Sequence, residues 1–412
     1  MANSLLEIKV KKDLNKWFGY FALFMSFNSI LFFRTNISMV VFLLILFQFA
    51  PKFNFFSIEK PAQRIVLLII IGILTSFWDT SAENLLNSSK SMQVLPNYLY
   101  WMIMVIILIN LRFDLNWLNI ARYVSIGLIF TLIIYFFRKG ISLPFIKNNT
   151  PNSYSFVLIC FSAITISYIG MKYNKMYALI VLTLLVLSVL VIERRAGTVL
   201  VLLSSLAALY LKRIKIQFMF PPLIVFIIMF ILIQLSVVEN AIYNQSPRIH
   251  ELIYESEEIT KTDQSYLTRR LMIERGLVIF SDNPLTGIGL NNYANIKVVN
   301  TEGNFEGADL VLNKLEDEHV SAHNSYLLVL VEGGLLLLIP IIILFTFILY
   351  HFVIDYNKRS QIENSYFWSF LAVIIHLYFI AEIVNVYAWF LFGCVAAICT
   401  KINDEKNKQL TL

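Results

Sequence analysis

The sequence carries little charge for its length. Only 15% of its 412 residues are charged, whereas soluble domains have roughly 25%. Hydrophobic residues make up 58% of the chain, and the mean hydropathy is +0.70. A soluble fold could not bury that much apolar surface. The composition therefore excludes an ordinary soluble protein and indicates an integral membrane protein.

Cysteine is also scarce. The three cysteines, Cys160, Cys394 and Cys399, all lie in apolar runs, which leaves none to staple the longest hydrophilic segment. The sequence therefore indicates neither a disulfide framework nor a zinc site. The net charge of +6 could suggest a nucleic-acid partner, but most lysines and arginines occupy short segments between apolar runs. Membrane orientation explains them better, so no nucleic-acid binding is expected.

Apolar runs suited to crossing ~30 Å of hydrocarbon recur along almost the whole chain. They predict an all-α integral membrane protein with about 12 transmembrane helices, so residues 1–412 are expected to form a single polytopic membrane domain. The predicted runs are 17–33, 37–51, 65–78, 95–111, 118–137, 154–171, 177–192, 196–211, 217–238, 325–350, 366–384 and 386–400. No small-residue cleavage site follows the first run, so we expect it to be a retained helix rather than a signal peptide.

Lysine and arginine are unevenly distributed between the two sides of this topology. If the N-terminus is cytoplasmic, the inside segments hold 19 of the 33 lysines and arginines, and the short outside loops hold 7. By the positive-inside rule, this bias predicts that both termini are cytoplasmic. The one large hydrophilic segment, residues 239–324, then lies outside. Within it, residues 266–280 predict amphipathic helix ended by Asn283 and Pro284, which we expect to lie against the membrane surface as a partial lid.

Three groups of polar residues converge on the outer side in this topology. The first is Glu193, Arg194 and Arg195, which lie between two apolar runs. An arginine at that depth is costly unless it meets an anion. Snorkelling to the interface, or an ion pair with Glu193, would satisfy it equally well.

The second group is Arg269, Arg270, Glu274 and Arg275. Guanidinium groups bind phosphate oxygens in a planar two-point geometry and stay charged, which suits them to hold a diphosphate through a reaction. Gly287 and Gly289 follow as a Gly-x-Gly motif. No third glycine opens a helix after this motif and no buried strand precedes it, so a tight turn is expected rather than a dinucleotide site.

The third group is His319, His323 and Asn324, just before the tenth apolar run. The two histidines are four residues apart and could share a helix face as metal ligands, but no firm third ligand accompanies them. His323 is better suited to act as a general base or a diphosphate contact, with a helix-capping role as the alternative. His376 and Glu382, in and near the eleventh run, are further ionisable groups within the membrane.

In their order along the chain, these motifs resemble those of the O-antigen ligase and O-antigen polymerase superfamily of bacterial envelope glycan enzymes. Members share a similar number of spans and one large periplasmic loop in the C-terminal half. The resemblance covers about residues 150–340 and is carried by Pro151, Asn152, Arg195, Arg269, Glu274, Gly276, Leu277, Pro284, Leu285, Thr286, Gly287, Ile288, Gly289, His323, Asn324, Glu332 and Gly334. Two positions depart from the pattern. Leu337 stands where a further glycine is expected, and Arg194 stands where many relatives have a small hydroxyl residue.

The resemblance implies a GT-C-like fold and a metal-independent inverting glycosyltransferase that needs no cofactor. Its donor would be an undecaprenyl-diphosphate-linked glycan, with the lipid diphosphate as the leaving group. The resemblance implies His323, Arg269 and Arg195 as catalytic residues. The residues implied in substrate binding are Arg194, Arg270, Arg275, Asn324, Glu274, Gly287 and Gly289.

Two acceptors are compatible with this chemistry. A polymerase of O-antigen, capsule or exopolysaccharide would use a second lipid-linked glycan, whereas an O-antigen ligase would use lipid A-core. We expect a polymerase, with a chain-length regulator protein as a further partner, because one envelope can need several polymerases but usually one ligase. A polysaccharide transporter or flippase is a more remote alternative, since such proteins commonly show two related halves and this chain shows none. The expected location is the bacterial cytoplasmic (inner) membrane, with the large loop in the periplasm and membrane lipid around the spans.

Overall fold

The computed structural model describes residues 2–26, 31–32, 35–49, 60–79, 85–137, 151–191, 195–211, 264–293, 322, 324–379 and 385–410. In these ranges the chain is helical apart from one antiparallel pair of two-residue strands, β1 (Leu31–Phe32) and β2 (Thr35–Asn36). The helices are α1 (Ala2–Ser26), α2 (Ile37–Phe49), α3 (Pro61–Asp79), α4 (Leu85–Asn110), α5 (Trp117–Phe137), α6 (Pro151–Lys172), α7 (Lys175–Val191), α8 (Arg195–Tyr210), α13 (Gln264–Asp282), α15 (Ser325–Asp355), η5 (Tyr356–Lys358), α16 (Gln361–His376) and α17 (Val386–Leu410).

Each predicted apolar run in the described ranges coincides with a helix, and the run at 217–238 lies outside them. Four helical segments of the described chain are long and apolar enough to cross a membrane: Trp117–Ile134, Tyr154–Lys172, Ser325–Lys358 and Val386–Glu405. Shorter apolar helices account for five further runs, at Ser38–Phe49, Pro61–Phe77, Val94–Asn110, Lys175–Val189 and Gly197–Tyr210. These helices are consistent with a helical integral membrane protein, and the total of 12 spans stays a prediction.

Two of the predicted run boundaries are wrong. The run expected at 17–33 forms α1 only to Ser26, whose carbonyl oxygen accepts a 2.8 Å hydrogen bond from the hydroxyl of Thr131 in α5. This hydrogen bond from α5 satisfies a carbonyl group at the end of the helix. The helix can therefore stop there, and the small strand pair follows. The run expected at 366–384 forms α16 only to His376, and residues 377–379 form a turn.

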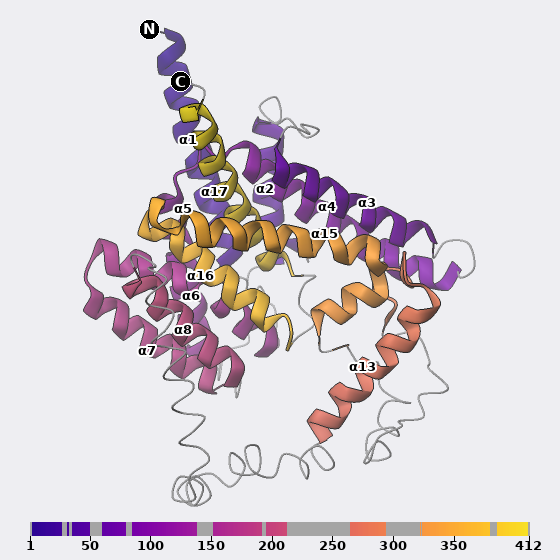
Figure 1. Ribbon diagram of the computed structural model, residues 1–412. Helices are drawn as coiled ribbons and strands as arrows, with labels where there is room; N and C mark the ends of the chain where they lie inside the picture. The colour runs from indigo at the N-terminus through magenta and orange to yellow at the C-terminus, as the bar shows by residue number, and fades with distance from the viewer. Residues whose placement is uncertain are drawn as a thin grey trace, which may run out of the picture.

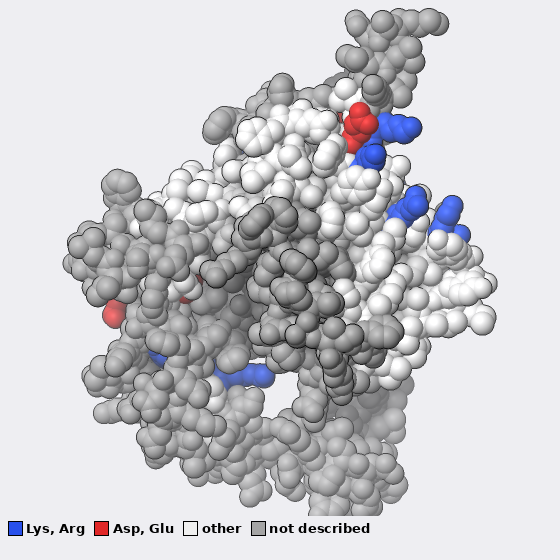
Figure 2. Space-filling model, turned by 180° about the vertical axis from the view of Figure 1, so that it is seen from behind, with Lys and Arg blue, Asp and Glu red and all other residues white. Residues whose placement is uncertain are grey.

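The described helices other than α13 pack through one apolar core. The main pairs are α1 with α5, α3 with α15, α4 with α17, and α16 with both α6 and α8. Figure 1 shows the two termini at one end of the molecule and α13 at the other. On the face that Figure 2 shows, charged side chains gather next to the end that carries α1, and most of the other described side chains there are uncharged.

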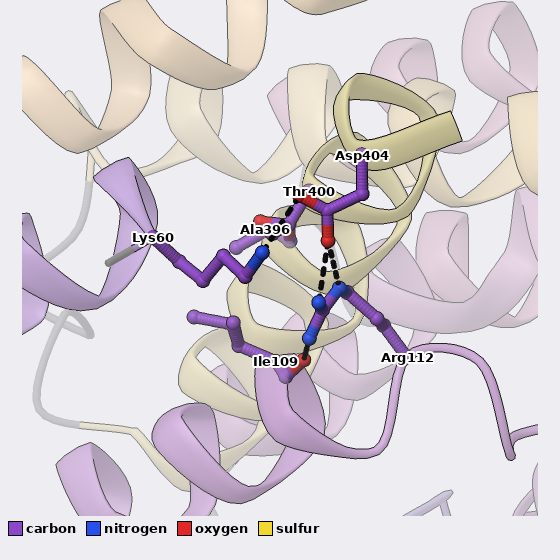
Figure 3. Close-up of polar contacts among 6 residues, drawn as sticks. All are labelled: Lys60, Ile109, Arg112, Ala396, Thr400 and Asp404. Atoms are coloured by element: carbon purple, nitrogen blue, oxygen red, sulfur yellow. Dashed lines mark hydrogen bonds and ion pairs between the residues drawn. The ribbon is translucent and has the colours of Figure 1, made fainter. Parts of the chain in front are cut away.

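An ion-pair cluster joins α17 to two other helices near the end that carries the termini (Figure 3). The carboxylate of Asp404 accepts hydrogen bonds from Lys60 Nζ at 2.9 Å and from Arg112 Nε at 2.8 Å, and it also contacts Arg112 Nη2. Arg112 Nη1 donates to the carbonyl oxygen of Ile109 at 2.9 Å. One carboxylate therefore ties α17 to the start of α3 and to the end of α4.

Candidate functional site

A helix is present where residues 266–280 predicted one, as α13, although its outer face also exposes the apolar side chains of Ile273, Leu277 and Val278. Its place at the membrane surface stays a prediction. Its buried face contributes Met272 and Ile279 to a cluster that includes Leu327 and Val331 of α15. Gly276 permits this close packing, because a Cβ there would lie 2.8 Å from Leu327 Cδ1. α13 is therefore held against the first two turns of α15.

The predicted helix end is also confirmed, since α13 stops at Asp282, and the Gly-x-Gly motif forms a turn. Gly287 and Gly289 have φ angles of +69° and +89°, in the left-handed region that glycine adopts without strain. A Cβ on Gly287 would also lie 2.5 Å from the carbonyl carbon of Glu332. The motif therefore lets the turn lie directly against the backbone of α15.

A break in α15 receives this turn. Gly334 has φ 62° and ψ −166°, so the helix is interrupted there and backbone donors and acceptors lose their intrahelical partners. The turn supplies replacements through four backbone hydrogen bonds, which run from Ile288 N to Val331 O (2.9 Å), Gly289 N to Glu332 O (2.9 Å), Leu335 N to Pro284 O (2.9 Å) and Leu336 N to Leu285 O (3.1 Å). The turn and the break thus form one structural unit. The sequence motifs include both the Gly-x-Gly at residues 287–289 and Gly334, but they do not show that these two segments of the chain pair with each other.

Glu332 and Tyr293 extend this unit with buried polar contacts. The Glu332 carboxylate, 4% exposed, accepts a 3.1 Å hydrogen bond from Tyr293 N. The hydroxyl of Tyr293 donates to Met272 O of α13 at 2.9 Å, and burial raises the pKa of Tyr293 to about 12. Tyr293 therefore stays neutral and keeps its donor. The role of these two residues was not predicted beyond the place of Glu332 in the family pattern.

Arg275 belongs to the same buried cluster. Its guanidinium carbon lies 5.2 Å from the centre of the Tyr293 ring, and Nη2 donates to Tyr293 O at 3.4 Å. The side chain is only 7% exposed. In this position Arg275 contributes to holding residues 287–293 against α13, and its predicted contact with substrate stays a prediction.

Arg269 and Arg270 lie on the exposed face of α13, more than one turn before Arg275. Arg270 Nε pairs with Glu274 Oε1 at 3.2 Å, and both side chains are more than one third exposed. Exposed i,i+4 pairs contribute only about 0.3–0.5 kcal/mol, so an anionic ligand can displace Glu274 at little cost. This face of α13 can therefore offer two guanidinium groups to a phosphate.

Asn324 caps α15. Its side-chain oxygen accepts hydrogen bonds from Tyr326 N at 2.9 Å and from Leu327 N at 3.1 Å. Such a cap fixes the start of the helix. The predicted residues His319, His323, Arg194 and Glu382 lie outside the described residues, as does the side chain of Arg195, whose backbone begins α8.

The last turn of α16 supports the start of α15. Ser325 N donates to Leu377 O at 2.9 Å, and the Tyr326 hydroxyl donates to Ile374 O at 2.7 Å. His376, 4% exposed, stacks on Phe156 of α6 with ring centres 6.0 Å apart. Gln361, at the start of α16, donates to the carbonyl oxygens of Ala208 and Leu209 at the end of α8, so these two helices run antiparallel. The starts of α6, α8 and α15 therefore lie toward the end of α16.

Metal ligands do not gather in the part of the chain that the structure describes, where no three His, Cys, Asp or Glu side chains form a group. Metal independence stays a prediction. Cys160, Cys394 and Cys399 are buried free thiols, as their positions in apolar runs suggested.

Part of the chain matches a known protein family. A family model described as O-antigen ligase matches residues 179–342. The matched range begins in α7 and ends in α15 beyond the break at Gly334, so it contains all of α8 and α13 and the turn that joins α13 to α15. The search of curated proteins found no match. The match confirms the resemblance drawn from the sequence motifs.

Proposed function

We propose that this protein is a GT-C-like inverting glycosyltransferase of a bacterial envelope, because residues 179–342 match a family model described as O-antigen ligase. It transfers a glycan from undecaprenyl diphosphate at the outer face of the cytoplasmic membrane. The observation that carries the proposal is the unit formed by α13, its turn and the broken α15. This unit ties a helix with exposed arginines to the helix that starts at Asn324 and Ser325.

In the proposed topology, both termini are cytoplasmic and α13 lies on the outer side. The cluster of Lys60, Arg112 and Asp404 then lies on the cytoplasmic side, where positively charged residues are expected to gather. Residues 239–324 form the large periplasmic segment, and about 12 spans cross the membrane.

On the donor side, Arg269 and Arg195 stabilise the charge that develops on the diphosphate, with Arg270 and Arg194 as further contacts. The bond between the anomeric carbon and the diphosphate oxygen breaks, and the lipid diphosphate leaves with the electron pair. Guanidinium groups match phosphate oxygens in a two-point geometry and remain charged throughout. Preorganised cations of this kind supply much of the stabilisation in transfer reactions with an anionic leaving group.

On the acceptor side, His323 accepts the proton of the attacking hydroxyl as the new bond to the anomeric carbon forms. An imidazole with an ordinary pKa near ~6.5 is largely neutral at pH 7 and can take that proton. Asn324, the next residue along the chain, caps α15.

For the acceptor, we propose a second lipid-linked glycan, which makes the protein a polymerase. The second candidate is an O-antigen ligase acting on lipid A-core, which is compatible with the description of the matching family. The two proposals use the same donor chemistry and differ only in the molecule that supplies the hydroxyl. A chain-length regulator protein would be a partner of the polymerase alone.

Deleting the gene and separating the envelope glycans on a gel tests the proposal and distinguishes the acceptors. Loss of a polymerase leaves single repeat units on lipid A, whereas loss of a ligase leaves long chains on the carrier lipid. Complementation with the wild-type gene should restore the original pattern. An unchanged glycan pattern in the deletion strain, with no lipid-linked intermediate accumulating, would argue against glycan transfer altogether.

A further inference from the structure

The turn that ends α16 carries two exposed aromatic rings. Leu377 is fully buried, whereas Tyr378 and Phe379 are 58% and 41% exposed. Their ring centres lie 5.3 Å apart, and the ring planes are nearly perpendicular, at 88°. One ring edge therefore meets the other ring's face, and together they make an apolar corner on the surface.

The backbone beneath this corner is fixed. Leu377 N donates to Val373 O at 2.9 Å, Tyr378 N to Ile375 O at 3.2 Å, and Phe379 N to His376 O at 2.9 Å. The buried His376 stacks on Phe156 and supports the turn from the other side. Two aromatic rings on such a support present their surfaces with little loss of side-chain entropy when a ligand binds.

The corner lies beside the candidate site. Leu377, the residue before Tyr378, accepts the hydrogen bond from Ser325 N, and Ser325 is the first residue of α15. The Tyr326 hydroxyl adds a second bond to the same turn of α16, at Ile374 O. Figure 1 shows the end of α16 next to the first turns of α15.

We propose that Tyr378 and Phe379 form a carbohydrate-binding platform that holds a sugar ring of the lipid-linked glycan. This inference rests on the proposed glycan transfer, and it adds a subsite on α16, outside the matched residues 179–342. A pyranose ring has an apolar C–H face, which packs on an aromatic face, and a hydroxylated edge, which the Tyr378 hydroxyl can hydrogen-bond.

The chemistry of neighbouring surfaces favours a sugar over a lipid tail as the occupant. The exposed apolar side chains in the first turns of α15 beyond its break are aliphatic (Leu336, Ile339, Ile342 and Ile343), and the exposed aromatic Tyr350 lies near the far end of the helix. The platform is aromatic instead, and it adjoins a helix start that carries Asn324 and Ser325. Interfacial anchoring is the alternative role of such rings, and the experiment below separates it from sugar binding.

The test is binding of a lipid-free probe to the full-length protein in nanodiscs. The probe is the repeat-unit oligosaccharide released by mild acid from lipid-linked glycan of the source strain, and saturation-transfer NMR measures its affinity. We expect Tyr378→Leu combined with Phe379→Leu to weaken binding about tenfold, because leucine keeps the apolar character and loses the flat ring. Tyr378→Trp should retain binding.

A control variant separates folding from the platform, and the probe, which lacks a diphosphate, excludes donor chemistry. Tyr173, 68% exposed and directly after the end of α6, is a matched aromatic residue, and Tyr173→Leu should bind the oligosaccharide normally. Unchanged affinity in the double leucine variant would overturn the platform, and so would equal weakening by Tyr173→Leu.

Failure of the proposed glycan transfer and failure of the platform give different results. If the wild-type protein binds the oligosaccharide through these rings but transfers no glycan in reconstituted membranes, the platform stands and glycosyl transfer is rejected. If transfer occurs and the double leucine variant binds and turns over like the wild type, the platform is rejected and the transferase stands.

Discussion

The amide of Gly289 donates to the carbonyl oxygen of Glu332 across the break in α15, at 2.9 Å. This bond and its three neighbours bring a turn that ends α13 into register with a helix more than 40 residues further along the chain. The position of α13 therefore depends on the break, and the break depends on Gly334.

Replacing Gly334 with alanine should destabilise the whole unit. Its φ of 62° is strained for any residue with a Cβ, and that Cβ would also collide with the carbonyl oxygen of Leu285. Strain of this kind costs about 1–3 kcal/mol before the lost hydrogen bonds are counted. Thermal unfolding in detergent should show a lower midpoint. Gly170→Ala is the control, because its new methyl meets only the flexible tip of Leu209; an equal effect of both variants would contradict a special role for the break.

Replacing Asp404 with asparagine should destabilise the packing of α17. Lys60 and Arg112 would lose their shared carboxylate while remaining only 27% and 11% exposed. Removing one partner of a largely buried charged group typically costs about 1–3 kcal/mol. The measurement is again the unfolding midpoint, with Asp114→Asn as the matched control because its pair with Lys11 is exposed on both sides. A midpoint equal to that of the control would show that the cluster contributes nothing measurable.

The sequence predicted those parts of the fold that depend on local pattern. The period of residues 266–280 and the breaker at Asn283 and Pro284 located α13 closely, and the apolar runs located the other described helices. The insertion of the turn into α15 could not be predicted, because it pairs groups more than 40 residues apart and a Gly-x-Gly motif alone is satisfied by any tight turn.

The residues of the candidate site were likewise predictable only where local sequence decides their place. The sequence selected Arg269 and Arg270 as anion ligands by residue type, and both are exposed on α13. It also grouped Arg275 with them, but burial against Tyr293 separates that guanidinium from the other two. Burial is a property of packing between distant segments, so spacing on one helix could not reveal the difference.

The outer location of the hydrophilic segment can be tested with single cysteines. A cysteine at Asn304 should react with a membrane-impermeant thiol reagent applied from the periplasmic side, and one at Asn357 should not, because charge bias places these positions on opposite sides. The three native cysteines are buried and should give a low background. Labelling with the two positions exchanged would reject the proposed mechanism.

Replacing Arg195 or Arg269 with lysine should lower glycan transfer by about tenfold or more, since lysine keeps the charge and loses the two-point fork. Transfer is measured in reconstituted membranes at equal protein abundance. Arg122→Lys, on α5 outside the proposed site, is the control and should behave as the wild type. Full activity of both lysine variants would count against diphosphate clamping by these arginines.

Replacing His323 with alanine should abolish transfer and leave donor affinity largely intact. The proposed diphosphate contacts lie on other residues, whereas no other group is proposed to take the acceptor proton. Loss of a general base alone typically costs 10²–10⁴-fold, roughly the range expected here. The measurements are glycan transfer in reconstituted membranes and the affinity for the lipid-diphosphate donor, made on the same preparations.

His319→Ala is the matched control for this last prediction. His319 lies four residues from His323 and has no counterpart in the family motif, so replacing it should reduce glycan transfer much less. The two alanine variants also test metal binding. If His319 and His323 held one ion together, either substitution would reduce transfer about equally, and transfer would require a divalent cation. If His323 acts as the base, transfer by the wild type survives excess chelator, and only His323→Ala is inactive. Equal damage from both substitutions, or an active His323→Ala protein, would remove His323 from the reaction.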